Sequence, residues 1–189
     1  MGFFLQTDRL VLRAFREDDV DDLLDLDNDP EVMRFLNGGL PKTREAMLAQ
    51  SVPRFLRDYP CFGNRGFWVA EERVAGRFLG WFELRPVDDT SAAEVELGYR
   101  LGRTAWGRGY ATEGALALVR KGFTELGVER VTAHTMTVNT RSRRVMEKTG
   151  LSYVRTFFEE WPETIEGSEL GDVEYALTKA DWAALNAWA

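Results

Sequence analysis

Apolar and polar residues alternate along the chain from Glu94 to Leu101. The apolar set is Val95, Leu97, Tyr99 and Leu101, and the polar set is Glu94, Glu96, Gly98 and Arg100. A period of two predicts a strand with one buried face. After a glycine-rich turn the period changes, and apolar residues recur at helical spacing from Ala111 to Leu126. We therefore predict a strand, a turn and a helix, with the helix beginning at about Arg108 and ending at Gly127.

The same patterns predict the remaining elements. Strands are expected at residues 9–15, 66–71, 77–85, 130–136, 151–160 and 172–178. Helices are expected over an acidic run at 17–29 that Pro30 should end, over 43–58 with a disturbance at Pro53, between Asn139 and Gly150, and around Trp182. The chain contains no repeat, low-complexity tract or linker. We expect residues 1–189 to form a single domain.

The glycine-rich turn predicts a binding site for an anion. Gly107 and Gly109 let the backbone approach a ligand without a Cβ in the way. The helix that follows points unpaired N–H groups and its positive dipole end at that ligand, which is most often a phosphate. A Walker A loop starting at Gly102 is excluded because Arg108-Gly109 stands where Lys-Ser/Thr is required. The acidic ribose partner of a dinucleotide motif is missing too. A tight turn without a ligand stays open as an alternative.

Composition and charge exclude several other classes. The 189 residues are 44% hydrophobic and 29% charged, which is typical of a soluble globular protein. A net charge of −7 argues against nucleic-acid binding, and no apolar run is long enough to span a membrane. A single cysteine, Cys61, excludes an internal disulfide and favours a cytoplasmic location. With one histidine, His134, there is no His-based zinc cluster.

A calcium site is considered and rejected for the acidic run. Asp25, Asp27 and Asp29 match the start of an EF-hand loop, but Pro30 occupies the position of its glycine and Leu36 that of its bidentate glutamate. We interpret the run as a solvated helix face and expect no metal.

Two motifs carry a family resemblance. Trp106-Gly-Arg-Gly109-Tyr-Ala111 resembles the pyrophosphate loop Gln/Arg-x-x-Gly-x-Gly/Ala of the GNAT superfamily of acetyltransferases, with Trp in place of Gln/Arg. The block from Asn139 through Ser142 to Leu151 resembles that family's Asn-x-x-Ser-x-x-x-x-x-Lys-x-Gly-Phe, with Leu for Phe. The resemblance covers nearly the whole chain and is closest to the branch that acetylates the N-terminal amines of ribosomal proteins. It implies an α+β fold with a mixed, mostly antiparallel, splayed sheet flanked by helices.

The resemblance also implies a reaction and a cosubstrate. An acetyl group would pass from acetyl-CoA to a primary amine, on a protein N-terminus or a small molecule, by direct attack in a ternary complex. The pyrophosphate would bind the N–H groups from Gly107 to Ala111, and the pantetheine arm would lie beside the strand near Tyr99. The predicted cosubstrate-binding residues are Tyr99, Arg100, Leu101, Arg103, Trp106, Gly107, Arg108, Gly109, Tyr110, Ala111, Thr112, Asn139 and Arg144, with Arg143 as a further cation.

Two residues are predicted to be catalytic. Glu96 is the candidate base because it shares the polar face of its strand with Gly98, which we expect to leave room for a substrate; Glu94 is the alternate. Ser142 occupies the position of the family's thiolate-facing serine. Tyr153 and Tyr175 remain alternatives for that role, whereas His134 is expected to be packed or hydrogen-bonded rather than catalytic.

Several properties stay open at this point. A CoA-binding regulatory domain without turnover and a structural interaction protein of the same fold are the alternatives to an enzyme. The sequence does not identify the amine, the length of the acyl group or the oligomeric state, for which a homodimer is one alternative.

Overall fold

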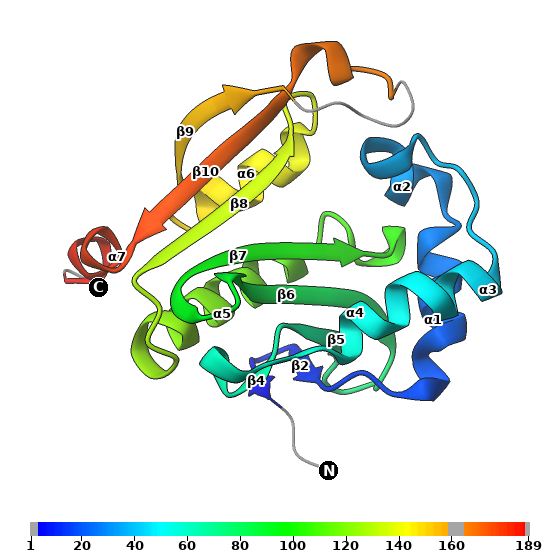
Figure 1. Ribbon diagram of the computed structural model, residues 1–189, viewed down its shortest axis with the longest axis horizontal. Coiled ribbons are helices and arrows are strands. Elements are labelled where there is room, and N and C mark those ends of the chain that lie inside the picture. Colours follow the sequence, from blue (N-terminus) through cyan, green and yellow to red (C-terminus); the bar gives the residue numbers. More distant parts are fainter. Residues whose placement is uncertain (1–3, 159–164, 188–189) are drawn as a thin grey trace.

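A single mixed sheet organises the protein. The computed structural model describes residues 4–158 and 165–187, and within these residues the main sheet has eight strands in the order β1-β2-β5-β6-β7-β8-β10-β9 (Figure 1). Their bounds are β1 Leu5–Gln6, β2 Leu10–Arg13, β5 Phe67–Glu72, β6 Phe78–Asp88, β7 Ser91–Leu101, β8 Arg130–Met136, β10 Asp172–Thr178 and β9 Ser152–Phe157. A small separate hairpin pairs β3 Asp58–Tyr59 with β4 Asn64–Arg65.

Helices cover both faces of the sheet. The N-terminal group comprises α1 Val20–Asp27, α2 Pro30–Asn37, α3 Arg44–Ala46 and α4 Val52–Leu56, and the later helices are α5 Tyr110–Glu125, α6 Thr140–Lys148 and α7 Lys179–Asn186. Short 3₁₀ turns span Glu17–Asp19, Pro60–Phe62, Arg103–Ala105 and Ser168–Leu170, and a π-helical turn spans Met47–Ser51. The α+β class and the mixed, mostly antiparallel sheet flanked by helices are confirmed.

The alternation predicted for residues 94–101 is confirmed and separates two packing environments. In the second half of β6, Phe82 and Leu84 join the buried cluster that contains Leu118 of α5. The odd-numbered Trp81 joins a second cluster that contains Phe55 of α4. By the same alternation, the polar positions of β6 and β7 lie on the α4 face of the sheet.

The strands β7 and β8 part half-way along their length. They are the one parallel pair described in the main sheet, and their register runs from Glu94 opposite Arg130 to Glu96 opposite Thr132. Beyond Glu96, β7 continues to Leu101 beside β6, while β8 turns away toward β10 (Figure 1). Pairing with only one neighbour leaves backbone groups of β7 available beyond residue 96.

Two predicted boundaries need correction. Pro30 begins α2 rather than ending a helix, because the fixed φ of proline suits the first helical position and Asp29 caps it by accepting from the Glu31 N–H at 3.0 Å. The helix after the glycine turn begins at Tyr110, two residues later than predicted. Residues 44–56 form a helix interrupted by the π turn ahead of Pro53, and this interruption was predicted.

The acidic run is only partly a solvated face. Asp27 is 4% exposed, and its carboxylate pairs with Arg100 and with the Lys42 Nζ at 3.2 Å. Among the described residues, no His, Cys, Asp or Glu cluster is arranged to hold a metal ion, and no helix is long and apolar enough to cross a membrane.

Candidate active site

The glycine turn opens directly onto a helix N-terminus. Gly107 and Gly109 have φ of +69° and +82°, in the left-handed region that favours glycine. Gly109 caps α5 without a side chain, and the first helical bond runs from the Glu113 N–H to the Gly109 carbonyl at 3.0 Å. The N–H groups of Tyr110, Ala111 and Thr112 come before this bond and therefore have no carbonyl partner within the helix. The turn presents an N–H-lined surface suited to an anion.

Side chains around the turn fix its shape. The Tyr110 ring is buried, and its hydroxyl donates to Glu72 at 2.7 Å. Arg9 stacks on that ring at 4.7 Å and donates to the Arg108 carbonyl at 2.8 Å. Trp106, which replaces the family's Gln/Arg, donates from its indole nitrogen to the Leu101 carbonyl at 2.7 Å. The tryptophan thus ties the turn to the end of β7.

The arginines among the predicted cosubstrate-binding residues, together with Arg143, divide into two groups. Arg100, Arg103 and Arg143 are each engaged elsewhere: Arg100 with the buried Asp27, Arg103 with Asp29 at 2.6 Å, and Arg143 with the Tyr175 hydroxyl at 3.1 Å and the Thr137 carbonyl. Arg144 is exposed on α6, and the Arg108 guanidinium lies over the Tyr110 ring at 5.3 Å. Sequence reasoning missed these engagements because the partners are distant in the chain.

Ser142 and Tyr99 meet where β7 leaves β8. The two hydroxyl oxygens are 3.1 Å apart, and Tyr99 also donates to the Ser142 carbonyl at 3.1 Å. Asn139 caps α6 by accepting from the Ser142 N–H at 3.3 Å, and so orients the serine. Burial raises the pKa of Tyr99 to about 12, and the hydrogen bond to Ser142 offsets only part of this rise. Tyr99 therefore stays protonated at neutral pH and is able to donate.

The two alternative tyrosines have other partners. The Tyr175 hydroxyl donates to Glu147 at 3.2 Å, and the Tyr153 hydroxyl lies 2.9 Å from that of Thr156. Tyr99 is the tyrosine that the described structure brings to Ser142.

Glu96 lies on the α4 face of the sheet between Arg85 and His134. One carboxylate oxygen pairs with Arg85, and the other lies 3.8 Å from the His134 Nδ1. Burial by itself raises the pKa of Glu96, but His134 and Arg85 together outweigh it and hold the pKa below its usual value. Glu96 is therefore ionised at neutral pH. Glu94, the alternate, is 42% exposed and pairs with Arg130 at 2.8 Å.

Glu83 is a site residue that sequence reasoning missed. It is 5% exposed on β6 and accepts from Arg54 of α4 at 3.1 Å and from Arg85 at 3.2 Å. Burial raises its pKa, the nearby Glu96 adds to this, and the two arginines offset it only in part. The signal was present, because Glu83 is a charged residue within the apolar run Phe78-Leu-Gly-Trp-Phe-Glu-Leu84.

The role predicted for Gly98 is wrong. Glu83 lies opposite Gly98 in the sheet register, and a Cβ on Gly98 would lie 2.8 Å from the Glu83 Cγ. The space left by the missing side chain is therefore filled by Glu83 and does not remain for a substrate.

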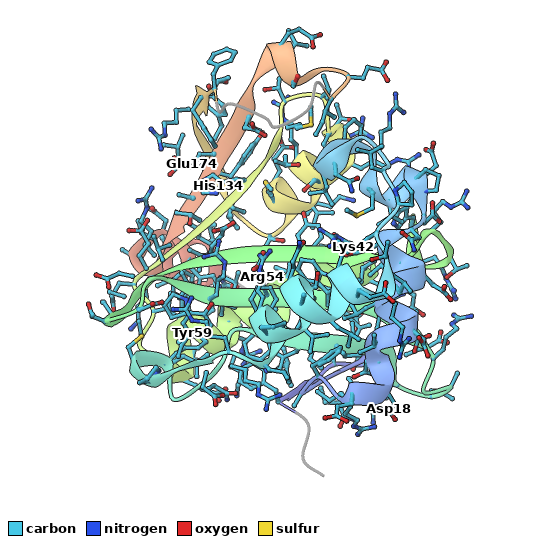
Figure 2. The ribbon with its side chains drawn as sticks, turned by 45° about the vertical axis from the view of Figure 1, so that its right-hand side comes forward. Asp18, Lys42, Arg54, Tyr59, His134 and Glu174 are labelled. Atoms are coloured by element: carbon cyan, nitrogen blue, oxygen red, sulfur yellow. The ribbon has the colours of Figure 1, made fainter. Side chains whose placement is uncertain are left out.

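The site has ionisable side chains on one face of the sheet and a pair of hydroxyl groups on the other. Figure 2 shows His134 on β8 beside Glu174 on β10, and Arg54 on α4. Glu96, His134 and Glu83 occupy the α4 face, whereas Tyr99 and Ser142 lie on the opposite face, against α6. Since β7 and β8 part between these two sets, a group lying between the strands would meet carboxylates from one side and hydroxyls from the other.

Comparison with known proteins identifies the family. The acetyltransferase (GNAT) domain family matches residues 9–152, well over half of the chain. The chain belongs to this family. A curated relative from Aspergillus fumigatus, FsC-acetyl coenzyme A-N(2)-transacetylase, is 36% identical over 193 residues, covering 94% of this chain and 77% of the relative. This GNAT protein is accordingly an acetyl-CoA-dependent N-acetyltransferase.

Solved structures of the family share the fold. An acetyltransferase (GNAT family) from Bacillus anthracis has a TM-score of 0.76 at 21% identity and covers 95% of this chain and 99% of its own. A spermidine N-acetyltransferase from Vibrio cholerae, in complex with CoA and spermine, has a TM-score of 0.75 at 17% identity and covers 93% of this chain and 99% of its own.

Proposed function

We propose that this GNAT protein transfers the acetyl group of acetyl-CoA directly to a primary amine within a ternary complex. In this reaction the amine nitrogen bonds to the thioester carbon, the carbon–sulfur bond breaks, the amine loses a proton and the thiolate gains one. The observation that carries the proposal is the parting of β7 and β8 between Glu96 on one face and the Ser142–Tyr99 pair on the other. Glu96 is then available to accept the amine proton, and the Ser142–Tyr99 pair is available to donate a proton to the thiolate.

For the cosubstrate, we assign the pyrophosphate to the N–H groups from Gly107 to Thr112. The positive φ of both glycines and the α5 dipole support this assignment. Arg108 and Arg144 supply cations, since the other predicted arginines are held by protein groups. The pantetheine arm would pair with the backbone of Tyr99 to Leu101, beyond the last β7–β8 pair.

Glu96 is proposed as the base. An alkyl ammonium with a pKa of about 10.4 must lose a proton before it attacks. Glu96 is ionised at neutral pH. It lies on the α4 face of the sheet, at the point where β7 and β8 part. It therefore accepts the proton, directly or through a water.

Ser142 is proposed as the donor to the departing thiolate. Its hydroxyl is oriented by the Asn139 cap and hydrogen-bonded to Tyr99. Tyr99 remains protonated because its pKa is raised. Ser142 gives its hydroxyl proton to the sulfur, and the Tyr99 hydroxyl, turning from the Ser142 carbonyl to the Ser142 Oγ, replaces that proton.

The acceptor class is proposed from both the relatives and the site. The name of the Aspergillus relative specifies acetylation at an N(2) position, and the Vibrio enzyme was solved with spermine. At the site, the ionised Glu96 suits an ammonium group, whereas arginines already pair with Glu83 and Glu174, so these two carboxylates add little to the preference. Resemblance to the branch that acetylates ribosomal-protein N-termini keeps a protein N-terminus among the candidates.

Paired variants test the two roles. Glu96→Gln keeps the shape but accepts no proton, so kcat/KM should fall about 100-fold to 10,000-fold at neutral pH and recover toward the pKa of the amine. Ser142→Ala should lose most activity with acetyl-CoA and less with an acyl donor whose thiol is more acidic. Glu94→Gln is the matched control and should stay within a few-fold of wild type. A few-fold loss in Glu96→Gln with an unchanged pH profile would remove Glu96 as the base.

The alternative is a CoA-binding domain without turnover. It predicts thermal stabilisation by CoA but no thiol release with any amine. The presence of Glu96 on one side of the parted strands and of Tyr99 and Ser142 on the other argues against this alternative, because CoA binding alone does not require these three side chains.

A further inference from the structure

His134 lies between two carboxylates at the end of the proposed proton path. Its Nδ1 is 3.8 Å from a Glu96 oxygen, and its Nε2 is 4.0 Å from a Glu174 oxygen. Both partners come from neighbouring strands, and Glu174 stands directly opposite His134 in the β8–β10 register (Figure 2). The imidazole stands edge-on to the Phe157 ring, with centroids 5.5 Å apart, and its side chain is 35% exposed.

The surrounding charges keep both carboxylates ionised. Glu174 is 8% exposed and accepts from Arg155 at 2.6 Å and from Arg130 at 3.3 Å. Burial raises the pKa of Glu174, but Arg155 and Arg130 counter it, as does His134 once it is protonated, and the pKa lies below its usual value. On the other side, Arg85 pairs with Glu96 and with Glu83, which Arg54 also reaches. Both carboxylates that face His134 are therefore paired with arginines.

We propose that His134 receives the amine proton from Glu96 and that Glu174 holds the imidazole in place for this transfer. The proposal rests on the proposed function. One N–H proton of the acceptor ammonium passes to the Glu96 carboxylate, and from there to the His134 Nδ1. The 3.8 Å separation is bridged by one water or by a small rotation of either side chain. The exposed imidazole then releases the proton to solvent, and Glu96 is ionised again for the next turnover.

The chemistry favours a histidine in this position. A carboxylate with an ordinary pKa of about 4.3 is a weak base, and it holds a proton taken from an ammonium group with a pKa of about 10.4 only unfavourably. An imidazole has an ordinary pKa of about 6.5 and holds the same proton about 100-fold more favourably. His134 therefore makes the step from Glu96 onward downhill. It acts through Glu96 and is a positioning and proton-holding residue.

The first test follows the histidine itself by NMR. His134 is the only histidine of the chain, so a preparation without a histidine tag gives one imidazole signal set to titrate. Because an opposite charge favours the protonated form, Glu174→Gln and Glu96→Gln should each move the midpoint of the titration to lower pH. An Asp21→Asn control, in an exposed pair with Arg44, should leave the midpoint in place. A midpoint that moves in neither variant would overturn the proposal, and this test needs no acceptor substrate.

The second test is the pH profile of turnover. In the wild type, kcat should fall as pH drops through the midpoint of His134. His134→Gln should lower kcat about 10-fold to 100-fold at neutral pH, lose this acid limb, and approach the wild-type rate near the pKa of the amine. A variant that is uniformly slower but keeps the limb would show a structural role and refute the proposal. If the wild type acetylates no amine, the proposed function fails instead, while the NMR result still stands.

Discussion

Gly98→Ala is predicted to destabilise the protein by displacing Glu83. A Cβ at residue 98 would lie 2.8 Å from Cγ and 2.9 Å from Cδ of Glu83, and closer still to Oε1. Glu83 is 5% exposed and is hydrogen-bonded to Arg54 and Arg85, so it does not move aside without breaking these contacts. The substitution therefore overpacks a buried polar site.

The expected magnitude combines two opposing effects. Overpacking costs about 1–3 kcal/mol, and the contact with several Glu83 atoms places this case in the upper half of that range. Replacing glycine by alanine within a strand returns about 0.5–1 kcal/mol through lower unfolded-state entropy. The net loss in the free energy of unfolding should be about 1–2.5 kcal/mol.

Urea denaturation of four variants measures this effect: Gly98→Ala, Gly102→Ala, Glu83→Ala and the double variant Glu83→Ala/Gly98→Ala. Gly102→Ala is the control, because the nearest atoms to its Cβ are 3.8 Å away and its φ is −62°, so its stability should change by less than about 0.5 kcal/mol. In a Glu83→Ala background the clash is gone, and Gly98→Ala should cost at least about 1 kcal/mol less than in wild type. Equal costs in both backgrounds, or a Gly98→Ala as mild as Gly102→Ala, would refute the reasoning.

Two further predictions concern the cosubstrate and the N-terminal half. CoA at about 100 times its dissociation constant should stabilise the wild type by about 2.7 kcal/mol. Gly109→Glu should abolish this thermal shift, whereas Gly63→Glu, at another left-handed glycine with open space, should retain it. Asp19→Asn should cost about 3–5 kcal/mol by breaking the buried bidentate pair with Arg13, which holds Asp19 at 2.8 and 2.6 Å. Asp21→Asn, in an exposed pair with Arg44, should cost less than about 1 kcal/mol; equal losses in the two aspartate variants would contradict the burial argument.

Local patterns in the sequence predicted most of the fold. Residues 130–136 were predicted as a strand with the bounds that β8 has, and Asn139 was predicted to cap α6, because alternation and capping depend on neighbours in the chain. Pro30 was misread because the same fixed φ that ends one helix also suits the first turn of the next.

The site was harder to predict because its contacts are long-range. Tyr99 and Ser142 are 43 positions apart, and no local pattern pairs them. Gly98 was assigned to substrate because the sequence does not show that Glu83 from the adjacent strand fills the space. Arg103 was assigned to a phosphate and Arg100 to the cosubstrate site, yet Asp29 pairs with Arg103 and Asp27 pairs with Arg100. Competition between a ligand and a carboxylate is decided by tertiary structure.

A direct assay of acetyl transfer is the strongest test of the proposed function. Purified protein is mixed with acetyl-CoA and a panel of primary amines, protein N-terminal peptides, alcohols and anionic compounds. Free thiol and acetylated product are then quantified together. We predict thiol release that depends on an amine, with one acetylated amine formed per thiol, and initial rates that show a ternary complex. Stabilisation by CoA without amine-dependent thiol release, or acetylation only of a hydroxyl compound, would contradict the proposed function.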